Sequence, residues 1–461
     1  MRRRRLGLGL RLVLNGPLLN LLRSAMSRGM PRVLIATVAL GSAATAFAQT
    51  QFRGGPAHAG VYASQAPRTM PGIAWQFTTG DRIVSSPVLS EGTLFFGSND
   101  GHVYALDAAS GRQRWAWRTE GAVPSTPAVQ DGRVHVLSYD GRLHTLDAAT
   151  GAPLWTFATG GERRFEARGL HGSTPRTQTI ADPYDVYLSS PAVVAGVLYF
   201  GSSDGHVYAL DAASGAPRWK QRTGDVVHAS PAVADGLVVV GSWDGSLYAF
   251  DALNGAARWR FQAGIDSLMA NQQGFQSSAA IIGGVVYVGC RDAHLYAIDA
   301  ATGKERWRFS TGASWVVGSP AVAHGRVYFA TSDSARLHAL DAQTGAPAWE
   351  QQTKAYQFAS PVVAGDVLLT GLLNGTLEAR DLAGGQALWT FRTEASQANV
   401  GWVLTADGRL NAPWIFHGGT QDAMVIGFDR QSSVGSFFSS ALVAGGVIYV
   451  GSADGRMVAL R

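Results

Sequence analysis

A unit of about 40 residues recurs through most of this chain, and one clear copy spans residues 189–221. It reads SSPAVVAGVLYFGSSDGHVYALDAASGAPRWKQ, in which four short apolar or alternating runs are separated by turn residues. β-Branched and aromatic residues favour strands, and Asp-Gly is a strong signal for a two-residue hairpin. A period near 40 with four strands per unit predicts the blades of a β-propeller rather than a helical solenoid. The expected fold class is therefore all-β.

The number of blades follows from the signal of the first strand, Ser-Ser-Pro or a close variant, which occurs eight times. Its copies are marked by Ser86, Thr126, Ser190, Ser230, Ser278, Ser319, Ser360 and Ser440. The last copy ends at Arg461 after its third strand, whereas an unassigned strand with Trp75 precedes the first copy. If that strand completes the last blade, no blade keeps an open edge. We therefore predict an eight-bladed β-propeller with four-stranded blades, closed by an N-terminal strand that completes the C-terminal blade.

A tryptophan occupies the fourth strand of each predicted blade. The eight are Trp75, Trp115, Trp155, Trp219, Trp259, Trp307, Trp349 and Trp389. A tryptophan can bury ~150–250 Å², which corresponds to about 4–6 kcal/mol at ~25 cal/mol per Å². The preceding Asp and Ser/Thr-Gly positions suit a turn. We expect these side chains to dock each blade onto its neighbour.

Three of these turns with their tryptophans resemble a known motif. The segments ALDAASGRQRW (105–115), ALDAASGAPRW (209–219) and AIDAATGKERW (297–307) are similar to the tryptophan-docking motif of the pyrroloquinoline-quinone-like (PQQ-like) propeller repeat. The resemblance covers residues 73–461. That family includes quinoprotein alcohol dehydrogenases and the lipoprotein subunit of the outer-membrane β-barrel assembly machine. The resemblance therefore implies the fold and leaves the function open.

The first 48 residues have the composition of a targeting segment. Residues 26–48 combine a basic start, an apolar centre and a small-residue end, which predicts a signal peptide cleaved after Ala48. Residues 1–25 are either an over-extended gene start or a longer basic region of the signal. A transmembrane anchor is the rival interpretation, but the apolar core is shorter than the ~20 residues that a span needs. The expected parts are a signal peptide at 1–48, an extended Gly/Pro-rich arm at 49–72 and the propeller at 73–461.

The charge and the cysteine content point to a periplasmic protein. The whole chain has a formal charge of +5, but the first 48 residues hold eight arginines and no acidic residue. Subtracting these eight from the 38 basic residues leaves 30 against 33 acidic ones, so no nucleic-acid partner is predicted. Cys290 is the single cysteine, which excludes an intramolecular disulfide and suits a buried thiol. No cysteine stands at the predicted cleavage site, so we predict no lipid anchor and expect a soluble exported protein.

Three insertions interrupt the 40-residue spacing, at 160–186, 264–275 and 393–435. Each lies between the tryptophan strand of one blade and the Ser-Ser-Pro strand of the next. In a propeller all such connections emerge on the same face. We name this side the insertion face and expect it to carry the functional site.

The residues just before the Ser-Ser-Pro signals differ in chemistry from blade to blade. They begin the innermost strands and are expected to surround the mouth of the central channel. The candidates for binding a ligand or partner are Arg82, Tyr187, His228, Gln276, Trp315 and Gln357. A structural role would permit the same variety without needing it, so both interpretations stay open.

Two of the insertions contain clusters with two interpretations each. Arg163, Arg164, Arg168 and His171 in the first insertion form either a solvated loop paired with nearby acids or a clamp for a carboxylate or other anion. The last insertion contains an aromatic group comprising Trp402, Trp414, Phe416 and His417. This group is either a stacking surface for sugars or peptide, or a satellite core that holds a long loop.

Catalytic motifs are mostly absent from the sequence. GSSDG at 201–205 matches the nucleophile-elbow pattern, but GSNDG, GSWDG and GSADG occupy the same hairpin in other blades, so the repeat explains it. The sequence contains no HExxH, CxxC or P-loop motif, and we predict no catalytic residue and no metal site.

Two function classes therefore compete. The first is a non-enzymatic exported propeller that acts as a binding or scaffold module for an envelope protein, a peptide or a small ligand. No cofactor is predicted for it. The alternative is a PQQ-dependent dehydrogenase, with the quinone and calcium in the central channel. The resemblance implies an adjacent cysteine pair over that cofactor, which a chain with one cysteine cannot form. A carbohydrate-binding or sensor module is a third possibility.

Overall fold

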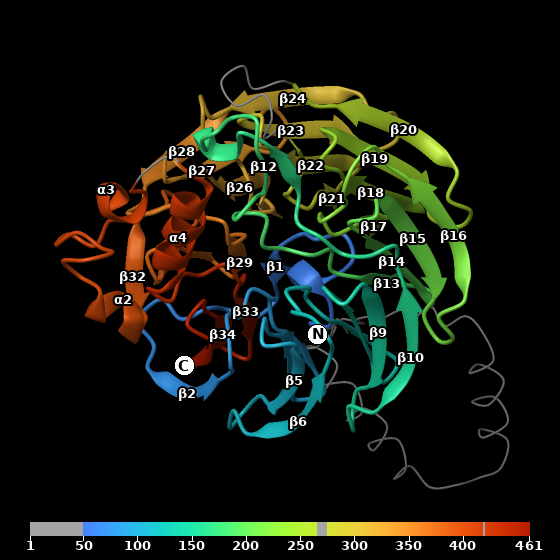
Figure 1. The fold of residues 1–461 in the computed structure, drawn as a ribbon, viewed down its shortest axis with the longest axis horizontal. Helices are drawn as coiled ribbons and strands as arrows, with labels where there is room; N and C mark the ends of the chain where they lie inside the picture. Colours follow the sequence, from blue (N-terminus) through green and yellow to red (C-terminus); the bar gives the residue numbers. More distant parts are fainter. Residues whose placement is uncertain (1–48, 265–273, 418–419) are drawn as a thin grey trace, which may run out of the picture. The chain divides into compact units, whose positions relative to one another are not determined.

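The computed structural model describes residues 49–264, 274–417 and 420–461, which belong to one compact unit. The predicted signal peptide lies outside the described residues. Eight sheets of four or five strands follow one another around a ring (Figure 1). The prediction of an eight-bladed all-β propeller is confirmed. In this part of the chain no helix is long and apolar enough to cross a membrane.

The blades are numbered from the first complete copy of the repeat, and each runs from its innermost to its outermost strand. Blade 1 contains β3 (Val88–Ser90), β4 (Thr93–Gly97), β5 (His102–Asp107) and β6 (Gln113–Arg118). Blade 2 contains β7 (Ala128–Gln130), β8 (Arg133–Ser138), β9 (Arg142–Asp147) and β10 (Pro153–Ala158). Blade 3 contains β13 (Ala192–Val194), β14 (Val197–Gly201), β15 (His206–Asp211) and β16 (Pro217–Arg222). Blade 4 contains β17 (Ala232–Ala234), β18 (Leu237–Gly241), β19 (Ser246–Asp251) and β20 (Ala257–Gln262).

The second half of the ring repeats this order. Blade 5 contains β21 (Ala280–Ile282), β22 (Val285–Gly289), β23 (His294–Asp299) and β24 (Glu305–Ser310). Blade 6 contains β25 (Ala321–Ala323), β26 (Arg326–Ala330), β27 (Arg336–Asp341) and β28 (Pro347–Gln352). Blade 7 contains β29 (Val362–Ala364), β30 (Val367–Gly371), β31 (Thr376–Asp381) and β32 (Ala387–Arg392). Blade 8 contains β33 (Leu442–Ala444), β34 (Val447–Gly451), β35 (Arg456–Leu460) and the N-terminal strand β2 (Ile73–Thr78).

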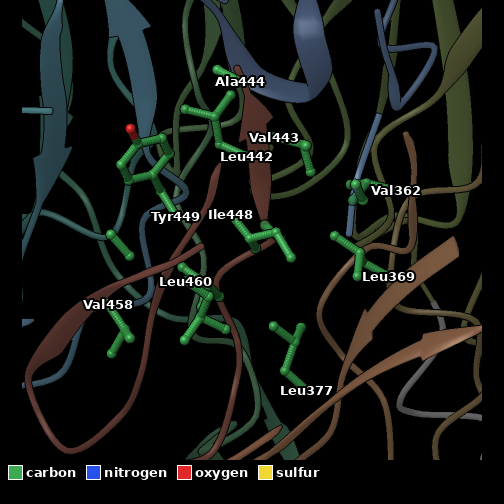
Figure 2. Close-up of a cluster of buried hydrophobic side chains, with 14 of the residues drawn as sticks. Val362, Leu369, Leu377, Leu442, Val443, Ala444, Ile448, Tyr449, Val458 and Leu460 are labelled. Carbon is green, nitrogen blue, oxygen red and sulfur yellow. The ribbon is translucent and has the colours of Figure 1, made fainter. Parts of the chain in front are cut away.

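The ring closes where β2 pairs antiparallel with β35, with Trp75 opposite Ala459. Gly72 and Arg461 exchange two backbone hydrogen bonds of 2.8 and 2.9 Å next to this pairing. The apolar layer between blades 7 and 8 is continuous with this closure, and Figure 2 shows its side chains pointing into one cluster. The predicted closure by an N-terminal strand is confirmed.

The tryptophans of the fourth strands contact the neighbouring blade in a repeated way. The indole N–H of Trp219, for example, donates to the carbonyl of Ala252 at 3.1 Å, and Trp75, Trp115, Trp259, Trp307 and Trp349 make the corresponding bond. Trp389 instead donates to Pro67 of the arm at 2.9 Å. The ring of Trp219 lies over Gly255, where a Cβ atom would stand only 2.7 Å from the indole. The glycine of each turn therefore makes room for the neighbouring tryptophan as well as supplying a positive φ.

The N-terminal arm follows the inner edges of the blades around the channel. It contains η1 (Phe52–Gly54) and β1 (Val61–Tyr62), and β1 pairs in parallel with β29. One backbone N–H from the innermost strand of each of blades 1 to 7 donates to the arm. The donors are Leu89, Val129, Val193, Val233, Ile281, Val322 and Val363. In blade 8 the carbonyl of Val443 accepts from the side-chain amide of Gln49 at 3.3 Å. The arm thus pairs strand edges that would otherwise be open toward the channel.

The insertions carry the non-repeating elements. The first contains β11 (Glu166–Arg168), η2 (Leu170–Gly172) and β12 (Thr179–Ala181), and β11 pairs only with β12. The last contains α2 (Glu394–Ala398), α3 (Ala412–Ile415) and α4 (Gln421–Ser432). Most of the second insertion, residues 265–273, lies outside the described residues. Helix α4 and strand β12 are both drawn in front of the ring in Figure 1.

Candidate functional site

The central channel is lined by a closed circle of hydrogen bonds. In every blade the hydroxyl of the second Ser or Thr of the Ser-Ser-Pro signal accepts the backbone N–H of the corresponding residue in the blade before it. The donor–acceptor distances lie between 2.8 and 3.1 Å, and the circle runs from Ser86 through Thr126 and back from Ser440 to Ser86. This contact gives the repeated serine a structural role in holding neighbouring blades together.

Side chains fill the channel on both sides of this circle. Phe52 of the arm lines the remaining space together with Tyr187, His228 and Gln276, which precede the innermost strands. The hydroxyl of Tyr187, which begins blade 3, donates to the carbonyls of Phe358 and Phe438 at 3.1 Å, so this side chain reaches blades 7 and 8. The space left for water-sized molecules is about 30 Å³. Since one water needs roughly 10–15 Å³ by this measure, the channel holds a few waters at most.

A buried arginine joins the first insertion to the ring on the insertion face. Arg291 follows β22, and its guanidinium lies between the rings of Trp243 and Trp315, 4.4 and 4.3 Å from their centres. It donates to Asp182 of the insertion at 2.5 Å and to Gln276 at 2.6 and 2.9 Å. The arginine is thus paired, hydrogen-bonded and stacked, as a buried charge requires.

Asp182 is the centre of this cluster. It also bonds the Nε2 atom of His171 at 2.7 Å and accepts the backbone N–H of Tyr184 at 2.9 Å. Burial alone would raise the pKa of Asp182, but the charges of Arg291 and His171 hold it well below its usual value. Removing one partner would leave an uncompensated buried charge.

A second buried cluster lies under the same insertion. His228 bonds Asp185 through Nδ1 at 2.8 Å and Ser203 through Nε2 at 2.7 Å. The hydroxyl of Ser203 also lies 2.6 Å from Glu162, which in addition accepts from Ser202 at 2.6 Å. Burial works to lower the pKa of His228, but Asp185 and Glu162 together hold it above its usual value. Burial raises the pKa of Glu162 above its usual value, although the hydrogen bonds from Ser202 and Ser203 act to lower it.

Asp185, His228 and Ser203 are connected in the order of a catalytic Ser-His-Asp triad. The protons, however, are placed differently. Glu162 accepts the proton of the Ser203 hydroxyl, so Nε2 of His228 must donate to that hydroxyl and has no lone pair with which to act as a base. Both Ser203 and His228 are also buried. The arrangement therefore functions as a buried hydrogen-bond network and does not present a nucleophile.

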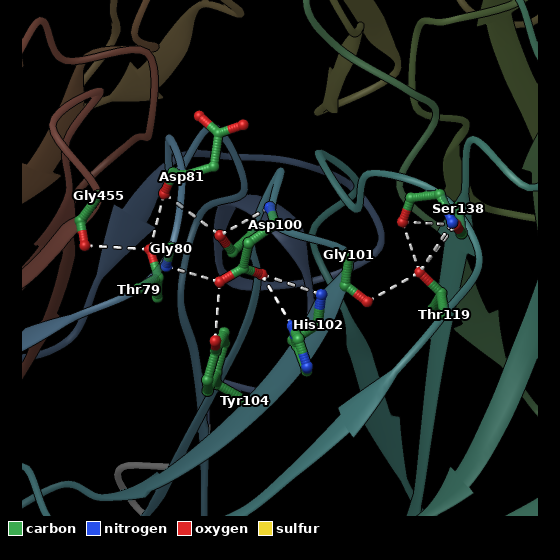
Figure 3. Close-up of polar contacts among 12 residues, drawn as sticks. Thr79, Gly80, Asp81, Asp100, Gly101, His102, Tyr104, Thr119, Ser138 and Gly455 are labelled. Atoms are coloured by element: carbon green, nitrogen blue, oxygen red, sulfur yellow. Dashed lines mark hydrogen bonds and ion pairs between the residues drawn. The ribbon is translucent and has the colours of Figure 1, made fainter.

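Sequence reasoning missed one variable position on this face. The residue before the Asp of the GSxDG hairpin contacts the first insertion in blades 3, 4 and 5, and only two of the eight blades have the same residue there. It is Asn99, Tyr139, Ser203, Trp243, Arg291, Ser332, Leu373 and Ala453 in blades 1 to 8. A comparison of this hairpin across the repeats would have shown the variation. The Asp that follows is constrained instead: Asp100 accepts the N–H groups of Gly80 and His102 at 2.8 and 3.0 Å (Figure 3).

The remaining candidates lie in separate environments. Arg82 pairs with Asp429 of α4 at 2.6 Å and lies over the ring of Phe428. Arg163 is exposed and lies 3.5 Å from Asp225, and Arg164 lies near Tyr139. Gln357 is enclosed within blade 7, where it bonds Thr353 and Thr370 at 3.0 and 2.7 Å. Arg82 and Gln357 are therefore not brought together with His228, Gln276 and Trp315, whereas Arg163 lies near enough to His228 for its charge to work to lower the pKa of that histidine.

The aromatic residues of the last insertion divide into two groups. Phe416 packs against a small apolar cluster under the loop that contains Ile415. Trp402 and Trp414 are 65% and 39% exposed, and the Arg430 guanidinium lies 4.6 Å from the centre of the Trp414 ring. Ile426, one turn before Arg430 on α4, is 47% exposed. The insertion thus has its own core and also presents large apolar side chains to solvent.

Comparison with known proteins agrees with this fold. The family model described as outer membrane protein assembly factor BamB matches residues 70–185, 172–282 and 267–407. The chain belongs to this family. No curated protein matches the chain by sequence.

Solved structures share the propeller with this BamB-family chain at low identity. BamB from Moraxella catarrhalis has 16% identity and a TM-score of 0.60, over 85% of this chain and 97% of its own. A europium-containing methanol dehydrogenase has 14% identity and a TM-score of 0.63, over 88% and 90%. Quinohemoprotein alcohol dehydrogenase from Comamonas testosteroni has 16% identity and a TM-score of 0.62, over 90% and 80%. At these sequence identities, the structural similarity shows a shared fold and does not show a shared function.

The channel of this family member does not fit a quinone cofactor. Pockets for ligands of that size have volumes of roughly 300–1,000 Å³, against about 30 Å³ here. The Tyr187 side chain and the arm occupy the space that the predicted alternative would need. Among the described residues, no group of three His, Cys, Asp or Glu side chains is placed to hold a metal ion.

Proposed function

We propose that this protein is an exported, periplasmic binding or scaffold module that docks a protein or peptide partner through its insertion face. The observation that carries the proposal is the exposed apolar surface of the last insertion. Trp402, Trp414, Val425 and Ile426 are 65%, 39%, 42% and 47% exposed, and together they account for half of the large exposed apolar side chains of the described chain. Exposed aromatic side chains next to an arginine are typical of binding hot spots.

The filled channel supports the same proposal. With the channel occupied by side chains and the arm, the elaborated surface available to a partner is the insertion face. The family model is named for an outer membrane protein assembly factor, which is a role among envelope proteins. Export through the signal peptide at 1–48 would place the chain in the same compartment.

A crosslinking experiment tests the docking surface directly. A photoreactive phenylalanine analogue replaces Trp402 or Trp414 in the full chain, expressed in its native host and illuminated in intact cells. Leu253 is the matched control, since it is 79% exposed and lies in the turn between β19 and β20, on the face opposite the insertions. We expect one and the same envelope protein to be captured from both tryptophan positions and not from Leu253.

The variant Ile426→Asp sharpens this experiment. It places a charge within the apolar surface and leaves the propeller blades unchanged. It should therefore abolish the crosslink to the partner while the protein stays folded. Capture of the same partner from Leu253, or an adduct that survives Ile426→Asp, would contradict docking through this surface. The captured chain should begin at Gln49 if the predicted cleavage is right.

A further inference from the structure

A pocket of about 380 Å³ opens on the insertion face between blades 6 and 7 and the two described insertions. This volume is in the range of small-ligand sites. Its wall contains the side chains of Tyr184, Trp315, Tyr356, Phe358 and Phe416, the imidazole of His171 and one carboxylate, Asp333. We call this site the aromatic pocket. It shares its walls with neither the exposed apolar surface of the last insertion nor the circle of hydroxyls in the channel.

The rings of the aromatic pocket are held in place from behind. Trp315 is fixed by Arg291 on one face and by its backbone N–H, which donates to Ser332 at 3.1 Å. Tyr184 packs against Phe358 with ring centres 5.7 Å apart, and its hydroxyl donates to Gln431 of α4 at 3.2 Å. The walls therefore need little ordering when a ligand binds.

Asp333 does not make the turn hydrogen bond that the equivalent carboxylate makes in other blades. In blades 1 to 5 the Asp of the hairpin accepts the backbone N–H two residues on. The blade 6 hairpin, ATSDSAR at 330–336, is one residue longer than the GSxDGH pattern of its neighbours. There Thr331 takes over, since its hydroxyl accepts the N–H of Arg336 at 2.9 Å and bonds Ser334 at 2.7 Å.

The carboxylate that this extra residue places in the pocket is not paired with a cation of its own, although the charges of His171 and Arg291 act on it. Within the described chain its hydrogen-bond partner is the hydroxyl of Ser332, and it forms no ion pair. The two basic side chains that act on Asp333, His171 in the wall and Arg291 stacked on Trp315, are both paired with Asp182 instead. Burial raises the pKa of Asp333, so its ionised form would gain from a cation in the pocket.

We propose that the aromatic pocket binds the alkylated ammonium group of a small organic cation. Aromatic faces attract cations, and a cage of several rings suits an ammonium that carries alkyl groups in place of N–H donors. With one carboxylate and few other acceptors, the pocket would leave the N–H groups of a primary ammonium unpaired, whereas a quaternary one has none to satisfy. This inference goes beyond the proposed function, because it requires no protein partner.

The test compares choline with 3,3-dimethylbutan-1-ol, which has the same shape but a carbon atom in place of the charged nitrogen. Isothermal titration of the full chain should show choline binding about tenfold or more tightly than this neutral analogue. Asp333→Asn should weaken choline about tenfold and leave the neutral analogue unchanged. Tyr356→Leu keeps the apolar volume but removes a ring, and it should also weaken choline selectively.

Glu120→Gln is the matched control, because it removes one exposed carboxylate from the connection between blades 1 and 2, outside the aromatic pocket. It should leave both affinities unchanged, and circular dichroism should show all three variants folded. Equal binding of choline and the neutral analogue, no choline binding at millimolar concentration, or unchanged affinity in Asp333→Asn would each overturn the proposal. The crosslinking of Trp402 is independent of these outcomes, so the two proposals can fail separately.

Discussion

Trp219→Ala tests whether the docking tryptophans stabilise the ring. Trp219 is 8% exposed, packs against Tyr199 and Phe250 of its own and the next blade, and covers Gly255. Truncating a buried tryptophan costs about 3–5 kcal/mol, because apolar burial is lost and a cavity remains. The lost hydrogen bond adds little, since the carbonyl of Ala252 still accepts from the Tyr199 hydroxyl at 2.9 Å. We expect the free energy of unfolding to fall by about 4 kcal/mol.

Urea unfolding followed by circular dichroism measures this change, and two tryptophans of the same chain serve as controls. Trp402 is 65% exposed, so Trp402→Ala should change the stability by less than about 0.5 kcal/mol. Trp155 occupies a docking position, but its indole N–H is buried without a partner among the described residues. Trp155→Phe removes an unpaired donor and should therefore cost less than Trp219→Phe. A loss below about 1 kcal/mol in Trp219→Ala would refute the docking role of these residues.

Two further variants test the buried parts of the ring. Burial lowers the pKa of His228 but Asp185 and Glu162 together raise it above 6.5, so its stabilisation is complete below pH 6.5 and is lost as the pH rises through the raised pKa. The urea midpoint should fall more steeply above pH 6.5 in the wild type than in His228→Gln, and parallel profiles would contradict this. A Cβ atom at Gly60, where φ is +66°, would stand 1.9 Å from the Arg53 guanidinium, whereas one at Gly236, where φ is +74°, would meet nothing within 4 Å. Gly236→Ala should lower the free energy of unfolding by about 1–2 kcal/mol from backbone strain alone. Gly60→Ala should lower the urea midpoint further, because the new Cβ atom also displaces the Arg53 side chain. Equal losses of stability in the two variants would show that the arm adapts to the Cβ atom at little cost.

The repeat made the ring predictable because each blade is specified locally. Alternation, Asp-Gly hairpins and the spacing of tryptophans such as Trp219 all lie within one unit of sequence. The closure was predictable by counting strands, since the last copy lacks the one that surrounds Trp75. We could therefore predict the number of blades, the closure of the ring and the face that carries the insertions without knowing which distant residues are in contact.

The path of the arm could not be predicted in the same way. Residues 49–72 have no periodicity, and their order comes from backbone bonds to strands as distant in sequence as Val363. The charge of Arg53 is buried there, where its guanidinium donates to the carbonyls of Pro320 and Pro361 at 2.8 and 3.0 Å. Such contacts produce no recognisable pattern in the local sequence, because a backbone carbonyl of any residue at the right position could accept the hydrogen bond.

The candidate site was only partly predictable for a related reason. His228, Gln276 and Trp315 were found because they vary beside a constant signal, and they do lie together beneath the first insertion. Their partners Asp182 and Asp185 lie within the first insertion, a segment that no other blade shares. Arg291 lies at the variable position of the GSxDG hairpin, and the constant residues around it indicate a turn and not a site.

The buried charges under the first insertion explain how a long loop can form a rigid binding face. A loop of this length loses considerable conformational entropy when it is ordered, and a small apolar cluster around Phe165 and Trp243 is its only described core. Asp182 and Asp185 add charged hydrogen bonds to Arg291 and His228, and each bond would leave a buried charge if it opened. The cost of opening therefore keeps the insertion in one conformation before any partner arrives. A surface that is ordered in advance spends less of its contact energy on ordering when it binds, and the same insertion supplies Tyr184 to the aromatic pocket.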